Sequence, residues 1–227
     1  NELNKMTKEI NQAYQKFNYQ DVYRFSNNFV NFSLSNFYLD FTKDILYIEN
    51  QDSLKRRSVQ TVIYQTLKDL ITLMAVITPY TSEEVYQLLP YKEEKSIHLV
   101  LMPKVKKYKD EKAINDKFEL FFQLKNDIYK ALEEARNAKK IGKSLEAEVY
   151  LNISDKYKPI IEEFKDDLKQ ILIISSLIIT KEDLPKYQHC QVQVKKFAGV
   201  RCERCWAYFK TDEMNGDICN RCFEVIN

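Results

Sequence analysis

Glycine, proline, histidine and tryptophan are scarce in this chain, and it contains no long apolar run. Three glycines and five prolines among 227 residues leave few chain breaks, which favours helices joined by short connections. No apolar stretch reaches the length that crosses a bilayer, so we expect no membrane as a partner. The longest apolar stretch, residues 171–179, predicts a buried strand instead.

Recognisable catalytic groups are also lacking. The only two histidines, His98 and His189, are isolated in the sequence, and no Ser/His/Asp set or carboxylate pair can be argued. No glycine-rich loop that could hold a phosphate follows a strand and opens a helix. We therefore predict no catalytic residue here. The charge is nearly balanced, with 35 basic and 33 acidic side chains, so net charge does not identify a partner.

The chain begins at Asn1, without a leader sequence and already inside a helical pattern. We therefore expect a fragment of a longer protein. Five cysteines leave one thiol, Cys190, outside any pairing. An odd thiol without a leader favours a reducing compartment, so we expect the protein to be cytoplasmic.

Apolar residues recur at helical spacing over the first 90 residues. The predicted buried faces are Leu3, Met6, Ile10, Ala13 or Tyr14 and Phe17; then Val22, Phe25, Phe29 and Phe32; then Val59, Val62 or Ile63, Leu67, Leu70 and Leu73. Thr78 precedes Pro79, which predicts the end of the third helix. Ser82 is predicted to cap a short fourth helix that ends near Pro90. These helices are expected to pack as an antiparallel bundle, closed by an extended stretch at 96–103.

The pattern changes after a basic linker at residues 104–109. A helix is predicted over about 111–140, ended by Gly142 in the left-handed cap position. Apolar residues then alternate from Leu145 to Ile153, as in a half-buried strand. A helical segment at 156–169 and strands near 171–179 and 189–196 should follow. We predict an α+β fold, mainly α, with a helical domain at 1–103, an α+β unit at 104–196 and a small module at 197–227.

Four of the cysteines form two Cys-x-x-Cys pairs near the end of the chain. The pairs are Cys202 with Cys205 and Cys219 with Cys222, and thirteen residues separate them. Two such knuckles can place four thiolates tetrahedrally around one Zn²⁺; two disulfides or unrelated thiols are the alternatives. Residues 197–227 are too few to build a core alone. We therefore predict one structural zinc per chain, with these four cysteines as its ligands.

Four stretches are similar to the C-terminal part of isoleucyl-tRNA synthetases, which are class I enzymes. The stretches are Tyr23–Tyr47, Ile77–Tyr86, Arg136–Ala147, and Cys202-Glu-Arg-Cys-Trp206 with Cys219-x-x-Cys222. The first two resemble the helical anticodon-binding domain, and Ile77–Tyr86 is also similar to the valine and leucine enzymes. The last resembles the terminal zinc ribbon of the bacterial isoleucine enzymes. A ribbon of this form also occurs in formamidopyrimidine-type DNA glycosylases, whose bodies differ.

The resemblance implies that this chain recognises tRNA and that the chemistry lies elsewhere. Neither nucleotide-binding signature of class I synthetases is present, so ATP is expected only at a catalytic domain outside this chain. The full-length enzyme would use ATP to attach isoleucine to its tRNA, and would be monomeric. The implied partner is isoleucine tRNA. The alternatives are the same region of a valine, leucine or methionine synthetase, and a stand-alone nucleic-acid-binding zinc module.

Two residues of the first knuckle are candidates for tRNA contact. Trp206 is either a core residue of a small ribbon or a stacking platform for an unstacked anticodon base, and related synthetases favour the platform. Arg204 would then offer its guanidinium to a phosphate or a base edge. Residues 197–227 carry four basic and five acidic side chains. Binding there should therefore depend on placed contacts more than on a general positive field.

Five further cations are candidates for the tRNA backbone: Lys139, Lys140, Lys143, Arg56 and Arg57. The three lysines lie at or just after the end of the predicted long helix, in a segment without acids. Cations there also complement the helix dipole, and a phosphate contact is compatible with that role. Arg56 and Arg57 begin the third helix, where a solvated helix face is the alternative to a tRNA contact.

Overall fold

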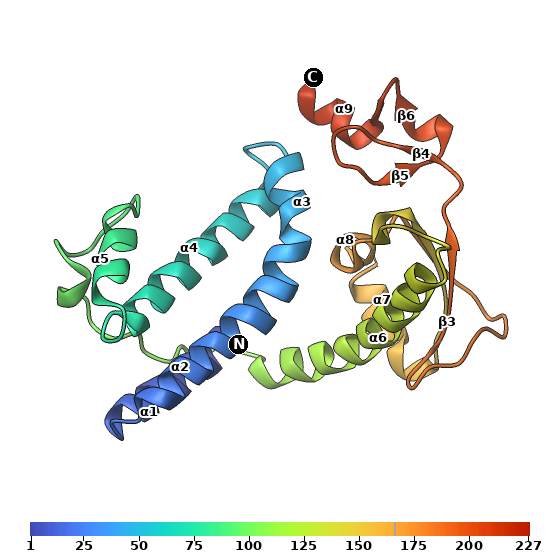
Figure 1. Ribbon diagram of the computed structural model, residues 1–227. Helices are drawn as coiled ribbons and strands as arrows, with labels where there is room; N and C mark the ends of the chain where they lie inside the picture. Colours follow the sequence, from blue (N-terminus) through green and yellow to red (C-terminus); the bar gives the residue numbers. More distant parts are fainter. Residues whose placement is uncertain (166) are drawn as a thin grey trace. The chain divides into compact units, whose positions relative to one another are not determined.

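The computed structural model describes residues 1–165 and 167–227, which form two compact units (Figure 1). Residues 1–46 and 51–111 make up the first unit, and residues 47–50 and 112–227 the second. The described part of the chain is mainly helical, with three small sheets, which confirms the predicted fold class. No described helix is both long enough and apolar enough to span a membrane. The three-domain division stays a prediction.

The first unit is a helical bundle. Its helices are α1 (Glu2–Gln15), α2 (Tyr19–Asn28), the π-helix η1 (Phe29–Leu39), α3 (Asp40–Ile48), α4 (Leu54–Met74), α5 (Pro79–Gln87) and the 3₁₀ turn η2 (Ile97–Leu99). α1 packs against α2, η1 and α4, and α5 packs against α4 and η2. One core gathers around Ile10, Val22 and Leu73, and a second around Ile71 and Tyr86. Apolar stripes from successive helices thus close on each other, as the periodicity predicts.

Three predicted core residues of this unit are exposed. Phe17 follows α1 with a left-handed φ of 54° and is 78% exposed. Phe32 is 68% exposed because it lies in η1, where each residue turns less than in an α-helix and Phe32 does not return to the face of Phe29. Leu67 is also exposed, because the polar Thr66 and Asp69 take the buried positions of α4. A pattern of apolar residues alone could not show this.

The helix ends near Pro79 also differ from the prediction. Ser82 does not cap α5: Thr78 is the N-cap residue, and Pro79 occupies the first turn, where its missing N–H costs nothing. Ser82 is buried inside the helix, with its hydroxyl 3.2 Å from that of Thr78. The stretch at 96–103 contains the 3₁₀ turn η2 and no strand.

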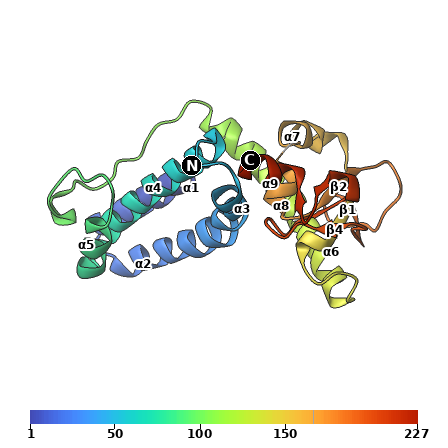
Figure 2. The same cartoon turned by 90° about the horizontal axis from the view of Figure 1, so that it is seen from above.

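The second unit builds a small sheet against helices (Figure 2). Its elements before the ribbon are α6 (Glu111–Asn137), η3 (Ser144–Glu146), β1 (Ala147–Asn152), η4 (Asp155–Tyr157), α7 (Lys158–Glu163), α8 (Leu168–Leu172), β2 (Ser176–Ile179) and β3 (Gln191–Lys196). The strand order is β2-β1-β3, with β1 parallel to β2 and antiparallel to β3. Every second residue of β1 is buried, from Ala147 to Leu151. This confirms the strand predicted from alternation.

Two predictions for this unit are wrong. Residues 171–174 do not form a strand, because α8 extends to Leu172 and Ile173 is left-handed. Gly142 is not the left-handed cap of α6. Lys139 has that conformation (φ 56°), with its N–H bonded to the carbonyl of Arg136 and that of Lys140 to Ala135, the Schellman pattern. The predicted helical segment at 156–169 breaks into η4, α7 and α8, and its residue 166 lies outside the described residues.

The ribbon, residues 197–227, consists of short hairpins and one helix. Its elements are β4 (Val200–Arg201), β5 (Tyr208–Phe209), η5 (Thr211–Glu213), β6 (Met214–Asn215), β7 (Ile218–Cys219) and α9 (Asn220–Ile226). Gly199 is required by packing: a Cβ there would lie 2.3 Å from the carbonyl oxygen of Phe209. Gly216 is favoured by conformation, because it opens the two-residue turn between β6 and β7 at φ 63°.

Candidate metal centre and nucleic-acid interface

Backbone hydrogen bonds shape the first Cys-x-x-Cys knuckle. The N–H of Trp206 bonds to the carbonyl of Cys202 at 2.9 Å, and the N–H of Cys202 bonds to the carbonyl of Ala207 at 2.9 Å. This tight turn joins β4 to β5 and folds the thiols of Cys202 and Cys205 onto one side. The turn leaves Trp206 with a left-handed φ of 65°.

The second knuckle lies where β7 passes into α9. Cys219 is the N-cap residue of α9, and Cys222 lies in its first turn. Two contacts join the knuckles: the N–H of Cys219 lies 3.3 Å from the Sγ of Cys202, and the N–H of Glu203 bonds to the carbonyl of Asp217. The β6–β7 hairpin therefore brings the second cysteine pair up to the first.

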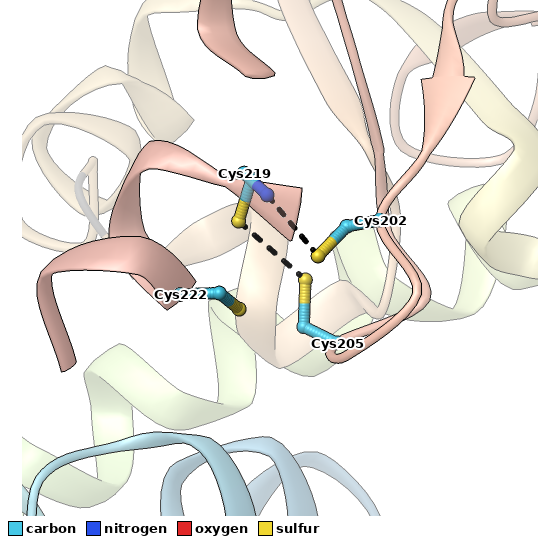
Figure 3. Close-up of side chains that lie close together, drawn as sticks. All are labelled: Cys202, Cys205, Cys219 and Cys222. Atoms are coloured by element: carbon cyan, nitrogen blue, oxygen red, sulfur yellow. Dashed lines mark hydrogen bonds between the residues drawn. The ribbon is translucent and has the colours of Figure 1, made fainter. Parts of the chain in front are cut away.

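The four thiols converge on one small volume (Figure 3). Their Sγ atoms all lie within 4.8 Å of one another, and all four cysteines are buried. The Sγ atoms of Cys205 and Cys219 are 3.8 Å apart, far longer than a disulfide of about 2.05 Å. Both Cys202 and Cys222 are free thiols as well. Within the described residues, this is the one group of cysteine, histidine or carboxylate side chains close enough to hold a metal ion.

The electrostatics of this cluster call for a cation. Burial raises the pKa of Cys205, and it raises that of Cys219 to about 11. Burial acts in the same direction on Cys202, but backbone N–H groups, first that of Cys205 and then those of Cys219 and Arg204, bring its pKa to about 6. Four buried thiolates would repel one another without a counter-ion. A soft divalent cation with tetrahedral geometry satisfies all four, so the donor set fits a closed structural Zn²⁺ site.

Trp206 lies outside the core of the ribbon. That core consists of the four cysteines and Ile48, with Ala207, Phe209, Met214 and Ile218 packed against them. Trp206 is 61% exposed, so its ring faces solvent beside the metal centre. Arg204, two residues earlier, is partly buried, and its Nη1 atom is covered without a hydrogen-bond acceptor in the described residues.

The other predicted contact residues lie on helix ends. Lys139, Lys140 and Lys143 are all exposed, on and just after the Schellman end of α6. Arg56 and Arg57 lie in the first turn of α4, whose N-cap residue Ser53 accepts from the N–H of Arg56 at 3.5 Å. Cations in a first turn oppose the helix dipole. The histidines contribute nothing to the thiol cluster; the backbone N–H of His189 bonds to Asp127.

Sequence reasoning missed the residue that ties the ribbon to the sheet. The hydroxyl of Ser175 accepts from the N–H of Tyr208 and donates to the carbonyl of Leu145. The one available signal was the pair of serines that interrupts the apolar run at 171–179. Such a pair does not reveal a partner thirty residues away.

Two family models match the chain. The model of the anticodon-binding domain of tRNA ligases matches residues 1–151. The model of a zinc finger found in FPG and IleRS matches residues 199–225, the segment that carries all four clustered cysteines.

Similar curated proteins share one description. The chain is 41% identical to the isoleucine–tRNA ligase of Staphylococcus haemolyticus over 235 residues, 42% identical to that of Staphylococcus carnosus and 39% to that of Bacillus mycoides. Each alignment covers 99–100% of this chain. The chain spans about a quarter of the length of these relatives and corresponds to their C-terminal part.

Proposed function

Because the chain belongs to the anticodon-binding domain family of tRNA ligases, we propose that it is the tRNA-recognising part of an isoleucine–tRNA ligase. The whole protein would attach isoleucine to its tRNA with ATP, in the cytoplasm and as a monomer. The relatives with this description cover the chain over its whole length. The chemistry would belong to the rest of the protein, and this chain would hold the anticodon arm of isoleucine tRNA.

The exposed Trp206 carries this proposal. A non-glycine residue in the left-handed conformation costs about 1–2 kcal/mol, and an indole that is 61% exposed gains little from burial. The hydrogen bonds of the knuckle impose this conformation, and they hold the exposed ring in one place. A flat ring beside a rigid knuckle suits stacking with an unstacked anticodon base.

The metal centre supports this platform. One Zn²⁺ per chain, held by Cys202, Cys205, Cys219 and Cys222, would join both knuckles and so fix the backbone that carries Trp206 and Arg204. With four protein ligands the site has no open position, which suits a structural role. The partly buried guanidinium of Arg204 would offer a donor to a phosphate or a base edge.

The cations on helix ends would add contacts to the tRNA backbone. Lys139, Lys140 and Lys143 are exposed on a well-defined turn, which suits them to phosphate oxygens. Arg56 and Arg57 stand in a first turn, where they do not stabilise their own helix. A bound phosphate would compensate for that unfavourable position.

Binding of isoleucine tRNA to the zinc-loaded chain tests the proposal. Trp206→Ala should weaken binding by about 1–3 kcal/mol and keep the zinc. Phe223→Ala is the matched control, because Phe223 is an exposed aromatic of the same ribbon, on α9, and its loss should leave the affinity unchanged.

Three results would overturn it. If Trp206→Ala binds as well as the unchanged protein, Trp206 has no part in recognition. If zinc and binding are lost together, Trp206 has a structural role instead. If the unchanged chain does not prefer isoleucine tRNA over a tRNA with an exchanged anticodon, the chain does not read the anticodon.

A further inference from the structure

The basic linker has an ordered structure in the first unit, although it contains no helix or strand. We call residues 103–109 the lysine strap. This segment contains Lys104, Lys106, Lys107 and Lys109. In Figure 2 it belongs to the green coil that follows α5. A run of lysines in a sequence usually indicates a flexible segment exposed to solvent. Here its backbone is tied to a helix.

Asparagines of α1 and its N-cap form a ladder that holds this backbone. The side chain of Asn4 is bidentate on Lys106, donating to its carbonyl at 2.6 Å and accepting from its N–H at 3.0 Å. Asn11 donates to the carbonyl of Pro103 at 3.0 Å, and Asn1 donates to that of Glu111 at 3.3 Å. Asn4 is only 8% exposed. These amides therefore bind the main chain and leave the lysine side chains unused.

The spacing of the ladder shows that the strap is extended. Asn11 lies seven positions after Asn4 in α1, a rise of about 10 Å. The strap covers the same interval with three residues, which requires a rise of about 3.3 Å each, as in a β-strand. The strap therefore runs antiparallel to α1 in a stretched conformation.

The four lysines of the strap differ in their ion pairs: one pairs with a carboxylate of the bundle, and the other three are available to a ligand. Lys106 pairs with the bundle: its Nζ lies 3.8 Å from the Oδ2 of the largely buried Asp69, although its side chain is 47% exposed. Lys104, Lys107 and Lys109 are exposed, and no carboxylate of the described residues pairs with them. Lys8 adds a fourth exposed cation on the α1 face that carries Asn4 and Asn11, one turn from each.

We propose that the lysine strap binds the phosphate backbone of the bound RNA, at a site separate from the zinc ribbon. The proposal rests on the proposed function, since it takes tRNA as the partner. Fixing the main chain in advance removes much of the entropy that a flexible lysine tail would lose on binding. The contact would be independent of sequence, because lysines meet phosphates as point charges and do not read base edges.

Salt-dependent tRNA binding by the zinc-loaded chain tests the strap. The triple variant Lys104→Gln/Lys107→Gln/Lys109→Gln should lose about tenfold or more in affinity at low salt. The slope of log affinity against log salt should fall by roughly two to three. The ratio of affinities for isoleucine tRNA and other tRNAs should stay the same.

Two variants serve as controls. Lys169→Gln/Lys181→Gln/Lys186→Gln removes the same charge from exposed positions of the second unit and should leave the slope unchanged. Asn4→Ala keeps every charge but releases Lys106, so it should weaken tRNA binding and speed hydrogen exchange at the Lys106 amide. An affinity unchanged in Asn4→Ala, with that amide exchanging faster, would show that order in the strap is irrelevant.

The outcomes separate this inference from the proposed function. If the unchanged chain binds tRNA and the strap triple binds it equally well with the same slope, the strap inference is wrong and the proposed function stands. Retained tRNA binding with loss of binding to poly-glutamate would assign the strap to an acidic protein partner instead. If the unchanged chain binds no tRNA, the proposed function itself fails.

Discussion

The hydroxyl of Ser175 accepts a 2.8 Å hydrogen bond from the backbone N–H of Tyr208. Ser175 directly precedes β2 of the three-stranded sheet, and Tyr208 begins β5 of the zinc ribbon. Because the same hydroxyl donates to the carbonyl of Leu145, it joins three chain segments. A polar side chain thus adds to the contact between ribbon and sheet, beside the backbone hydrogen bond from the N–H of Phe197 to the carbonyl of Glu146.

Replacing Ser175 with alanine should loosen the ribbon without releasing its zinc. The change leaves the N–H of Tyr208 without its acceptor, which should cost about 1–3 kcal/mol of unfolding free energy. Urea denaturation measures this loss, and metal analysis should find the zinc content unchanged. Ser176→Ala is the control, since no hydrogen bond of the Ser176 hydroxyl occurs among the described residues. Equal losses in the two variants would count against the Ser175 link.

Thiol titration should divide the five cysteines into four and one. Zinc-loaded protein should show almost no fast-reacting thiol at neutral pH, and chelation should expose four. Cys190 should stay slow after chelation. Burial, followed by the nearby carboxylate of Asp127, raises its pKa to about 12, so at pH 7–8 it is protonated and a poor nucleophile.

The variant Cys190→Ser is the control for this titration. It should keep the zinc and the count of four released thiols. Protein prepared with zinc present that contains almost none, or that contains two disulfides under reducing conditions, would disprove the metal site.

Lys139→Gly should make the chain more stable. Lysine in the left-handed conformation at the end of α6 is less favourable than glycine by about 1 kcal/mol. The denaturation midpoint should therefore rise, while tRNA affinity falls if Lys139 meets a phosphate. Lys140→Gly removes the same charge at a residue without a positive φ, so no stabilisation is expected there. A midpoint that shifts equally in both variants would contradict the assignment of the cap.

Arg204→Ala should weaken tRNA binding, and the manner of weakening identifies its contact. If Arg204 meets only a phosphate, all tRNAs should lose affinity and the salt slope should fall by about one. If it meets a base edge, isoleucine tRNA should lose most, about 1–3 kcal/mol. Arg201→Ala is the control, because the exposed Arg201 is paired with Glu203 at 2.9 Å. Unchanged affinity in Arg204→Ala would remove it from the interface.

The parts of the fold that sequence predicted are those set by local periodicity. The alternation in Ala147–Asn152 identified β1 because one face of the strand is buried and the other is partly exposed. The spacing of the four cysteines identified the residues that the hairpins bring together. Both signals are local: the alternation lies within one strand, and each Cys-x-x-Cys pair lies within one knuckle, where neighbours in sequence are neighbours in space.

The parts that sequence missed depend on partners far along the chain. Asp69 holds a buried position in α4 because Gln65 and Lys106 bond to it, and no apolar pattern reveals that. The asparagine ladder of α1 looks like an ordinary polar face until the strap is placed on it. Phe17, Lys139 and Ile173 adopt left-handed conformations at helix ends. Their residue types do not predict this, because glycine is the usual residue at such a position.

The two glycines of the ribbon should differ in how well they tolerate substitution. At position 216 only the backbone angle is constrained, and no atom lies within 4 Å of the space a Cβ would fill. Asparagine or aspartate, which tolerate a positive φ, could therefore replace it. At position 199 the carbonyl of Phe209 and the ring of Phe197 both lie within 2.5 Å of that space. In a saturation library, variants at 199 should disappear under selection for a working ribbon, whereas several at 216 should survive.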